Sequence, residues 1–171
     1  MVRGRQTKIP SPGQNAKVPA FGAINFASGR HLEHVPSVRK GGKNSAQFIL
    51  FLGKLAERAR RTRRLVILVL DNGPIHTSKV SGTALAELEA QNLIVPLWLP
   101  KYCPELNEQE RVWRVAKQQG IANVLFKDRA VLRRRVRRVL RSVTARSRPQ
   151  IAVSLGHRYR KRVHKKLGTP A

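Results

Sequence analysis

A continuous aliphatic run, RLVILVL at residues 64–70, leads directly into the polar sequence Asp71-Asn72-Gly73-Pro74. Branched and aliphatic side chains at successive positions predict a strand that is buried on both faces, central in a parallel or mixed sheet. Asp71 would then lie at the carboxyl end of the strand, where open α/β sheets present their ligand-binding residues. An Asp-Asn-Gly triplet after a strand is more often an ordinary turn, so this stretch alone does not establish a site.

Periodic apolar residues on both sides of this strand predict an α/β fold. Asn44 or Ser45 is expected to cap the first helix, and Pro96 places the last strand toward the sheet edge. Gly29 suits the turn of the hairpin, because glycine adopts a positive φ without strain. The expected order is hairpin (17–26 and 31–38), helix (44–61), strand (64–70), helix (78–91), strand (93–99), helix (about 105–119) and helix (about 128–143).

The charge of the chain is strongly positive and uneven. Lys and Arg number 35 against 9 acids, a net charge of +26, which predicts a polyanionic partner such as DNA or RNA. Residues 127–171 hold 16 of these basic residues and a single acid, Asp128. We therefore expect two parts, a domain at residues 1–126 and a basic helical extension at residues 127–171.

The extension begins with an amphipathic helix whose apolar stripe would dock on the domain. Arginines cover its other faces and are the candidate contacts to DNA phosphates. An anionic membrane is the alternative partner of such a helix, but the stripe carries no Trp or Phe anchor. The stripe consists of Leu132, Val136, Val139, Leu140 and Val143, and the candidate DNA-binding residues are Arg133, Arg134, Arg137, Arg138 and Arg141.

Cysteine usage and hydropathy bear on where the chain works. The single cysteine, Cys103, cannot form an internal disulfide, which fits a reducing cytoplasm. The longest aliphatic run, residues 65–70, is far too short to span a membrane. The sequence therefore predicts a cytoplasmic protein without a membrane partner.

Glu110 stands out in the helix expected at residues 105–119. It lies four residues after Leu106 and three before Trp113, on the stripe expected to face the core. A buried carboxylate needs a compensating partner. Arg111 or Arg114 supplies it in a structural salt bridge, or a metal ion does, or the carboxyl group is protonated and needs none.

Two motifs resemble those of a known family. The sequences DNGPIH at 71–76 and LPKYCPELN at 99–107, followed by Glu110 and Trp113, resemble the DDE-superfamily transposases of mariner-related bacterial insertion sequences. That family shows D-N-x-x-x-H after a strand and L-P-x-Y-x-P-x-L-N-x-x-E-x-x-W entering a helix. The resemblance covers about residues 3–126, and Glu110 follows Asp71 by 39 positions, a separation typical of the family. Glu108-Gln109 departs from the Pro-Ile that often precedes the family's glutamate.

The resemblance implies a ribonuclease-H-like fold and DNA strand cleavage and transfer by two-metal-ion chemistry. Asp71 would be the second and Glu110 the third of three carboxylates that bind Mg²⁺ or Mn²⁺. Asn72 and His76 would be supporting groups. Asn107 would be structural, and the protein would be associated with the bacterial nucleoid.

The family's first aspartate has no counterpart here. The chain contains only two aspartates, Asp71 and Asp128, and Met1 would begin just after the central strand that carries the first one. We therefore expect that the chain does not cleave DNA alone, that a separately encoded N-terminal segment supplies the strand, and that exposed strand edges favour a homo-oligomer. The alternative is a non-catalytic, basic DNA- or RNA-binding protein.

Overall fold

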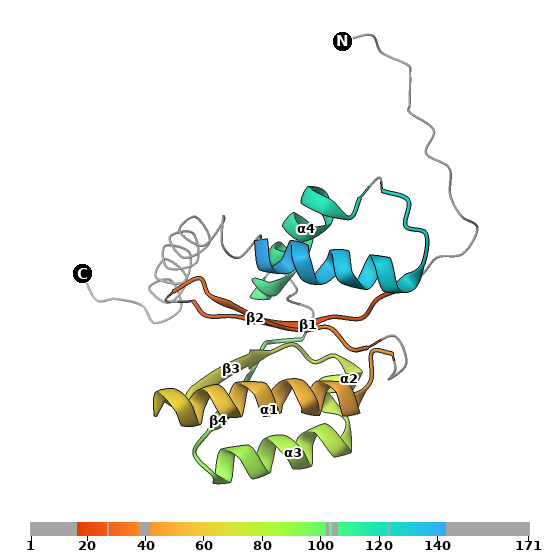
Figure 1. Cartoon of the computed structure of the whole chain (residues 1–171). Helices are drawn as coiled ribbons and strands as arrows, with labels where there is room; N and C mark the ends of the chain where they lie inside the picture. Colours follow the sequence, from red (N-terminus) through yellow and green to blue (C-terminus); the bar gives the residue numbers. More distant parts are fainter. Residues whose placement is uncertain are drawn as a thin grey trace.

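The computed structural model describes residues 17–26, 28–37, 42–101, 103, 106–122 and 124–142. Helices α1, α2 and α3 and the pair β3–β4 lie on one side of a hairpin, β1–β2, and α4 with a further helix at residues 129–142 lies on the other (Figure 1). In chain order the elements are β1 (Phe21–Ile24), β2 (His31–His34), α1 (Ser45–Thr62), β3 (Val66–Leu70), α2 (Pro74–Thr77), α3 (Lys79–Ala90), β4 (Ile94–Trp98) and α4 (Gln109–Gly120).

The hairpin is confirmed, with shorter strands than the sequence predicts. β1 and β2 pair antiparallel, with Phe21 opposite His34 and Ile24 opposite His31. The side chain of Asn25 accepts a hydrogen bond of 2.8 Å from the Ser28 amide, and Gly29 has a φ of 63°, as expected for this turn. The turn therefore sets the register that brings His31 to the start of β2.

Helix α1 begins where the sequence predicts. The side chain of Asn44 accepts a hydrogen bond of 3.0 Å from the Gln47 amide, which caps the helix. Phe48, Leu52 and Leu55 are buried on one face of α1. They form a core with β1, β3, β4 and α3, whose buried members include Phe21, Leu68, Leu70, Leu85 and Ile94.

The strands β3 and β4 pair parallel, joined through α2 and α3, with Leu68 opposite Pro96. The prediction that β3 is buried on both faces is wrong for the described residues, because Leu68 and Leu70 are buried whereas Ile67 is 65% exposed. The helices α1 and α3 pack on one face, and none of the described elements covers the other. Each strand of this pair has a single neighbour in the described chain, which places Pro96 on an edge strand as expected.

A second core joins α4, the hairpin and the helix at residues 129–142. Its buried members are Val35, Ala116, Leu132, Val136, Val139 and Leu140, which confirms the predicted apolar stripe apart from Val143, outside the described residues. The side chain of Asp128 caps this helix by accepting a hydrogen bond of 2.7 Å from the Val131 amide. Arg135 donates a hydrogen bond of 2.8 Å to the Gly120 carbonyl at the end of α4. Helix α4 is thus held in place by its packing against the helix at residues 129–142.

No helix in the described part of the chain combines the length and apolar character needed to cross a membrane.

Candidate active site

A cleft of about 460 Å³ separates β1 from β3. Consecutive residues of both strands line its walls, and Phe48, Phe51 and Leu55 of α1 line it as well. At one end it reaches Asp71 and the start of α4. A second hollow, of about 470 Å³, adjoins this end and is lined by residues that include Asp71, Asn107 and Glu110. Two hollows therefore share the same polar corner.

Asp71 lies directly after β3, half-buried at this corner, as the sequence predicts. Its Oδ1 accepts hydrogen bonds from the Gly73 amide at 3.0 Å and from His76 Nδ1 at 2.8 Å. Its Oδ2 accepts a hydrogen bond of 3.1 Å from Asn107 Nδ2. Because a carboxylate offers about four lone-pair positions, these three donors leave a position on Oδ2 for a cation.

These donors hold Asp71 in its ionised form. Burial raises the pKa of the carboxyl, but the hydrogen bond from Gly73 and the charge and hydrogen bond of His76 outweigh this effect. The charge of Lys43 lowers the pKa a little further. The pKa of Asp71 therefore lies below its ordinary value of 3.8.

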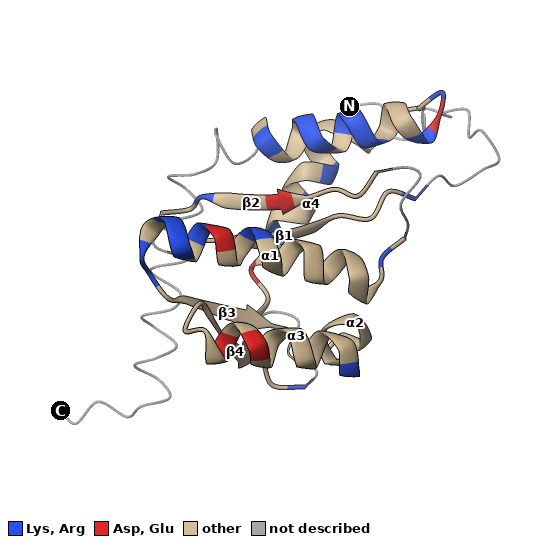
Figure 2. Cartoon of the chain, turned by 60° about the horizontal axis from the view of Figure 1, so that its bottom comes forward, with Lys and Arg blue, Asp and Glu red and all other residues tan. Residues whose placement is uncertain are grey.

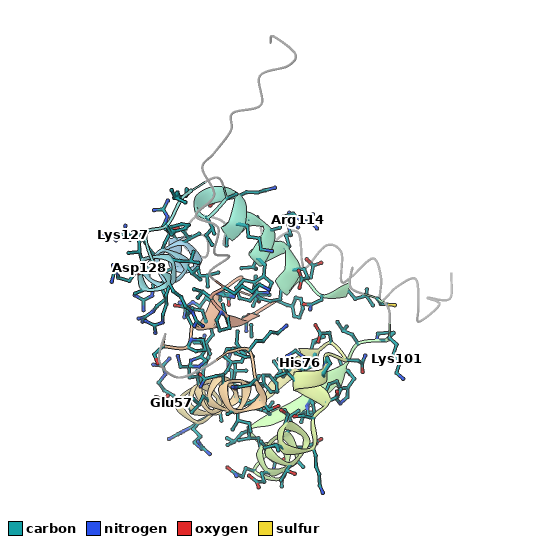
Figure 3. All side chains as sticks on the ribbon, turned by 90° about the vertical axis from the view of Figure 1, so that its right-hand side faces the viewer. Glu57, His76, Lys101, Arg114, Lys127 and Asp128 are labelled. Carbon is teal, nitrogen blue, oxygen red and sulfur yellow. The ribbon has the colours of Figure 1, made fainter. Side chains whose placement is uncertain are left out.

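His76 and Asn72 support the end of β3 in different ways. Nδ1 of His76 faces two acceptors of Asp71, Oδ1 at 2.8 Å and the backbone carbonyl at 3.3 Å, so this nitrogen carries a hydrogen. The ring also packs on Phe48, with centroids 4.6 Å apart. Asn72 donates a hydrogen bond of 2.6 Å to the Leu99 carbonyl, which ties the end of β3 to the chain leaving β4. Figure 3 shows His76 on α2 and Lys101 beyond β4 on the lower half of the molecule, with Arg114 of α4 above them.

Glu110 lies in the first turn of α4, and its side chain is exposed. The prediction that it faces the core is wrong, because α4 starts at Gln109 and buries the stripe Val112, Ala116 and Gly120. Within the described residues, neither Arg111 nor Arg114 forms an ion pair with it. Glu110 instead lines both hollows, together with Asp71. The structure thus brings the two predicted acids to one corner.

Sequence reasoning missed three polar residues at this corner. Asn107 was expected to be structural, and its Oδ1 does accept a hydrogen bond of 3.2 Å from the Gln109 amide, but its Nδ2 also donates a hydrogen bond to Asp71. Gln109 and His31 contact each other beside the cleft, at 2.9 Å. The motif shared with the family contains Asn107 and could have indicated its role, whereas no sequence signal links positions 31 and 109. Tyr102 and Pro104 of that motif lie outside the described residues.

Within the described ranges, no group of three or more acidic, His or Cys side chains is arranged to hold a metal ion. Asp71 and Glu110 supply carboxylate oxygens to this corner, whereas Asn107 turns its amide nitrogen toward Asp71. Oxygen donors of this kind suit Mg²⁺ and Mn²⁺, which prefer hard ligands. The described residues therefore fit part of a divalent-cation site.

The five arginines of the predicted DNA surface differ in their surroundings. Arg133 is half-buried and donates to the backbone carbonyls of Val35, at 3.0 Å, and Pro36. Arg141 pairs with Glu33 at 3.2 Å. Arg134, Arg137 and Arg138 are exposed, and their helix, at residues 129–142, shows several blue Lys and Arg positions along its ribbon in Figure 2.

Comparison with known proteins identifies the family. Residues 1–133 match the model of the DDE superfamily endonucleases. The chain belongs to this superfamily. It is also 30% identical over 143 residues to the 39 kDa protein of insertion element IS630 from Shigella sonnei, an alignment that covers 84% of this chain and 39% of that protein. The chain thus spans about two fifths of the length of the curated relative.

DDE superfamily endonucleases generally depend on divalent metal ions. The match ends at residue 133, inside the helix at residues 129–142. It therefore includes both acids of the corner, Asp71 and Glu110, and leaves most of the arginine-rich helix outside.

Proposed function

We propose that this chain carries part of a DDE transposase catalytic domain, in which Asp71 and Glu110 bind Mg²⁺ or Mn²⁺ for DNA strand cleavage and transfer. The observation that carries the proposal is the shared corner, to which β3 and α4 each contribute one acid. The exposed Glu110 is free of ion pairs with the described residues, and Asp71 is held ionised with a lone pair available on Oδ2.

In two-metal chemistry the bound ions activate the attacking oxygen and stabilise the leaving oxygen of a DNA phosphodiester. The chain's own contribution is to hold its two carboxylates in place. His76 and Gly73 fix Oδ1 of Asp71, while Asn107 fixes Oδ2. Asn72 holds the strand end itself through the Leu99 carbonyl. These partners make His76 and Asn72 supporting groups.

Such a site needs a third carboxylate, and we propose that it enters through the cleft between β1 and β3. β1 and β3 belong to separate two-stranded sheets, and the cleft between them is lined by residues 20–26 of one wall and 66–71 of the other. A strand in this cleft would pair with both edges and satisfy their backbone groups, which would make one mixed sheet of the ribonuclease-H-like kind. Such a strand would run toward the corner that holds Asp71.

We infer that a further segment, outside the described part of residues 17–142, supplies this strand and its aspartate, because the cleft holds no strand of the described residues. Asp128, the other aspartate of the chain, caps the helix at residues 129–142 and does not take this role. Without the strand, the open edges of β1 and β3 would favour pairing between copies as a homo-oligomer. The metal-dependent activity would require the completed sheet.

The experiment is a nicking assay on supercoiled plasmid. The purified chain with Mg²⁺ or Mn²⁺ should leave the plasmid intact, and addition of an aspartate-bearing strand peptide designed to fill the cleft between β1 and β3 should start nicking. Nicking should then be abolished in Asp71→Asn and Glu110→Gln but kept in Glu57→Gln, whose side chain is exposed on α1. Robust nicking by the chain alone, abolished in Asp71→Asn, would contradict the need for a third carboxylate.

A non-catalytic DNA- or RNA-binding protein is the second candidate. Arg134, Arg137 and Arg138 are exposed on one helix, and phosphate contacts need no catalytic site. This function predicts DNA binding that is unchanged in Asp71→Asn and Glu110→Gln, with no affinity for Mn²⁺.

A further inference from the structure

Two polar side chains meet beside the cleft, one from the hairpin and one from α4. Nε2 of His31, the first residue of β2, lies 2.9 Å from Nε2 of Gln109, the first residue of α4. The amide nitrogen of Gln109 is a donor, so Nε2 of His31 accepts and the ring is neutral, with its hydrogen on Nδ1. The contact joins elements that are 78 positions apart in the sequence.

The surroundings of this pair are fitted to it. The His31 ring meets Trp113 edge-on, with centroids 5.9 Å apart and planes at 87°. A Cβ atom at Gly22 would lie 2.5 Å from His31 Nε2 and 3.0 Å from Gln109 Nε2, so any larger residue there would push the pair apart. Gly22 on β1 thus leaves room for the His31–Gln109 pair, and Trp113 on α4 packs against the His31 ring.

The pair extends the network that holds Asp71. Gln109 donates its backbone amide to Asn107 Oδ1 at 3.2 Å, and Asn107 donates to Asp71 Oδ2 at 3.1 Å. The first turn of α4 is thus held from the side of β3 by Asn107 and from the side of the hairpin by His31. Glu110 is the next residue along the chain.

The His31–Gln109 pair buries polar atoms, which a contact made only for packing would avoid. Two of its atoms, Nδ1 of His31 and Oε1 of Gln109, are buried without a hydrogen-bond partner in the described part of the chain. An apolar pair would fill the same space without burying unpaired polar atoms. The arrangement therefore favours a directional contact, which fixes the rotation and position of the first turn of α4.

We propose that His31 is a positioning residue, which acts through Gln109 to hold the carboxylate of Glu110 at the corner shared with Asp71. This inference rests on the proposed function, in which Glu110 binds a divalent cation. Residues behind the metal ligands commonly change metal affinity by about 10–100-fold when they are replaced.

The chain offers a matched control on the same strand. Nε2 of His34 lies 3.0 Å from Gln47 Oε1, so this histidine also joins β2 to a glutamine on a helix. Its helix is α1, which carries neither of the two acids. His31→Leu and His34→Leu therefore remove equivalent contacts, of which one involves the helix of Glu110.

The test uses the full chain and two measurements, Mn²⁺ affinity by electron paramagnetic resonance and hydrogen exchange of the backbone amides. His31→Leu should weaken Mn²⁺ binding about tenfold and speed exchange at residues 106–113. His34→Leu should speed exchange at the start of α1 and leave Mn²⁺ affinity unchanged. His31→Gln, which keeps a polar partner for Gln109, should recover most of the affinity.

Three outcomes would overturn the inference. Equal reductions of Mn²⁺ affinity in the two leucine variants would show that the hairpin matters only for folding. Faster exchange at residues 106–113 with unchanged Mn²⁺ affinity would show that His31 stabilises α4 without positioning a ligand. A wild-type chain that binds no Mn²⁺ would refute the proposed function, and the role of His31 with it, whatever the exchange data show.

Discussion

The side-chain amide of Asn107 donates a hydrogen bond of 3.1 Å to Oδ2 of Asp71, across 36 positions of the sequence. The same side chain accepts the amide of Gln109 at the start of α4. One residue thus connects the end of β3 to the helix of Glu110. Asp71 and the start of α4 are therefore linked through a single side chain.

The first prediction concerns Asn107. Asn107→Leu removes the donor to Asp71 and the acceptor for Gln109 while keeping a similar volume. Mn²⁺ affinity should fall about tenfold or more, because a residue that orients a metal ligand is removed. Isothermal titration with Mn²⁺ measures this change. Asn72→Leu is the control, because it removes only the hydrogen bond to the Leu99 carbonyl. It should lower the free energy of unfolding but reduce Mn²⁺ affinity less than Asn107→Leu does. An equal fall in Mn²⁺ affinity in both variants would count against the role of Asn107.

The second prediction concerns the charge of Asp71. Its folded pKa lies below 3.8, so the ionised carboxylate adds stability that is fully present above this value and is lost as the pH falls through the lower folded pKa. Asp71→Asn should therefore unfold at lower urea concentration than the wild type at neutral pH, with chelator present. The difference should persist to about pH 5 and shrink below 3.8. A difference that grows on acidification would contradict this assignment.

The third prediction separates two kinds of arginine on one helix. Replacing the exposed Arg134, Arg137 and Arg138 by alanine should weaken DNA binding and reduce its salt dependence, by about 0.9 in the log–log slope for each DNA phosphate that the variant no longer neutralises. Fluorescence anisotropy with a DNA duplex at several salt concentrations measures both effects.

Two controls accompany this measurement. Arg133→Ala should instead lower stability, because its guanidinium is committed to the Val35 and Pro36 carbonyls. A triple alanine variant of the exposed Lys54, Arg61 and Arg64 removes the same charge elsewhere and should change the slope less. Equal slopes for the two triple variants would mean that net charge alone, and not this helix, determines binding.

The fourth prediction concerns the packing of α4 on the helix at residues 129–142. A Cβ atom at Gly120 would lie 2.5 Å from Cγ2 of Val139, so Gly120→Ala must push the helices apart. We expect a decrease of about 1–3 kcal/mol in the free energy of unfolding. Gly53→Ala, within α1, is the control, because a Cβ atom at Gly53 would meet nothing within 4 Å. This substitution should increase the free energy of unfolding by about 0.5–1 kcal/mol. Urea denaturation of both variants decides the point, and a neutral Gly120→Ala would show that this interface is loose.

The sequence predicted local structure well because local signals determine it. Asn44 caps α1 and Gly29 takes a positive φ, both from patterns within a few residues. The order of elements and the position of Asp71 at the end of β3 followed in the same way. The short helix α2 was not predicted, since Pro74–Thr77 is too brief for a periodic pattern.

Burial and long-range contacts were predicted less well. Ile67 is exposed because burial depends on which elements cover the sheet, which an aliphatic run does not specify. Glu110 was placed on the buried stripe because the helix was expected to start near residue 105, whereas α4 starts at Gln109 and buries a different stripe. The His31–Gln109 contact spans 78 positions and has no local signature. That the acids at 71 and 110 would meet was available only from the family resemblance.

The most direct test of the central claim is Mn²⁺ binding by the purified chain, followed by electron paramagnetic resonance. If Asp71 and Glu110 share one cation, then Asp71→Asn and Glu110→Gln should each weaken binding at least about tenfold, and Glu57→Gln should not. Wild-type affinity in either of the first two variants would contradict a shared site.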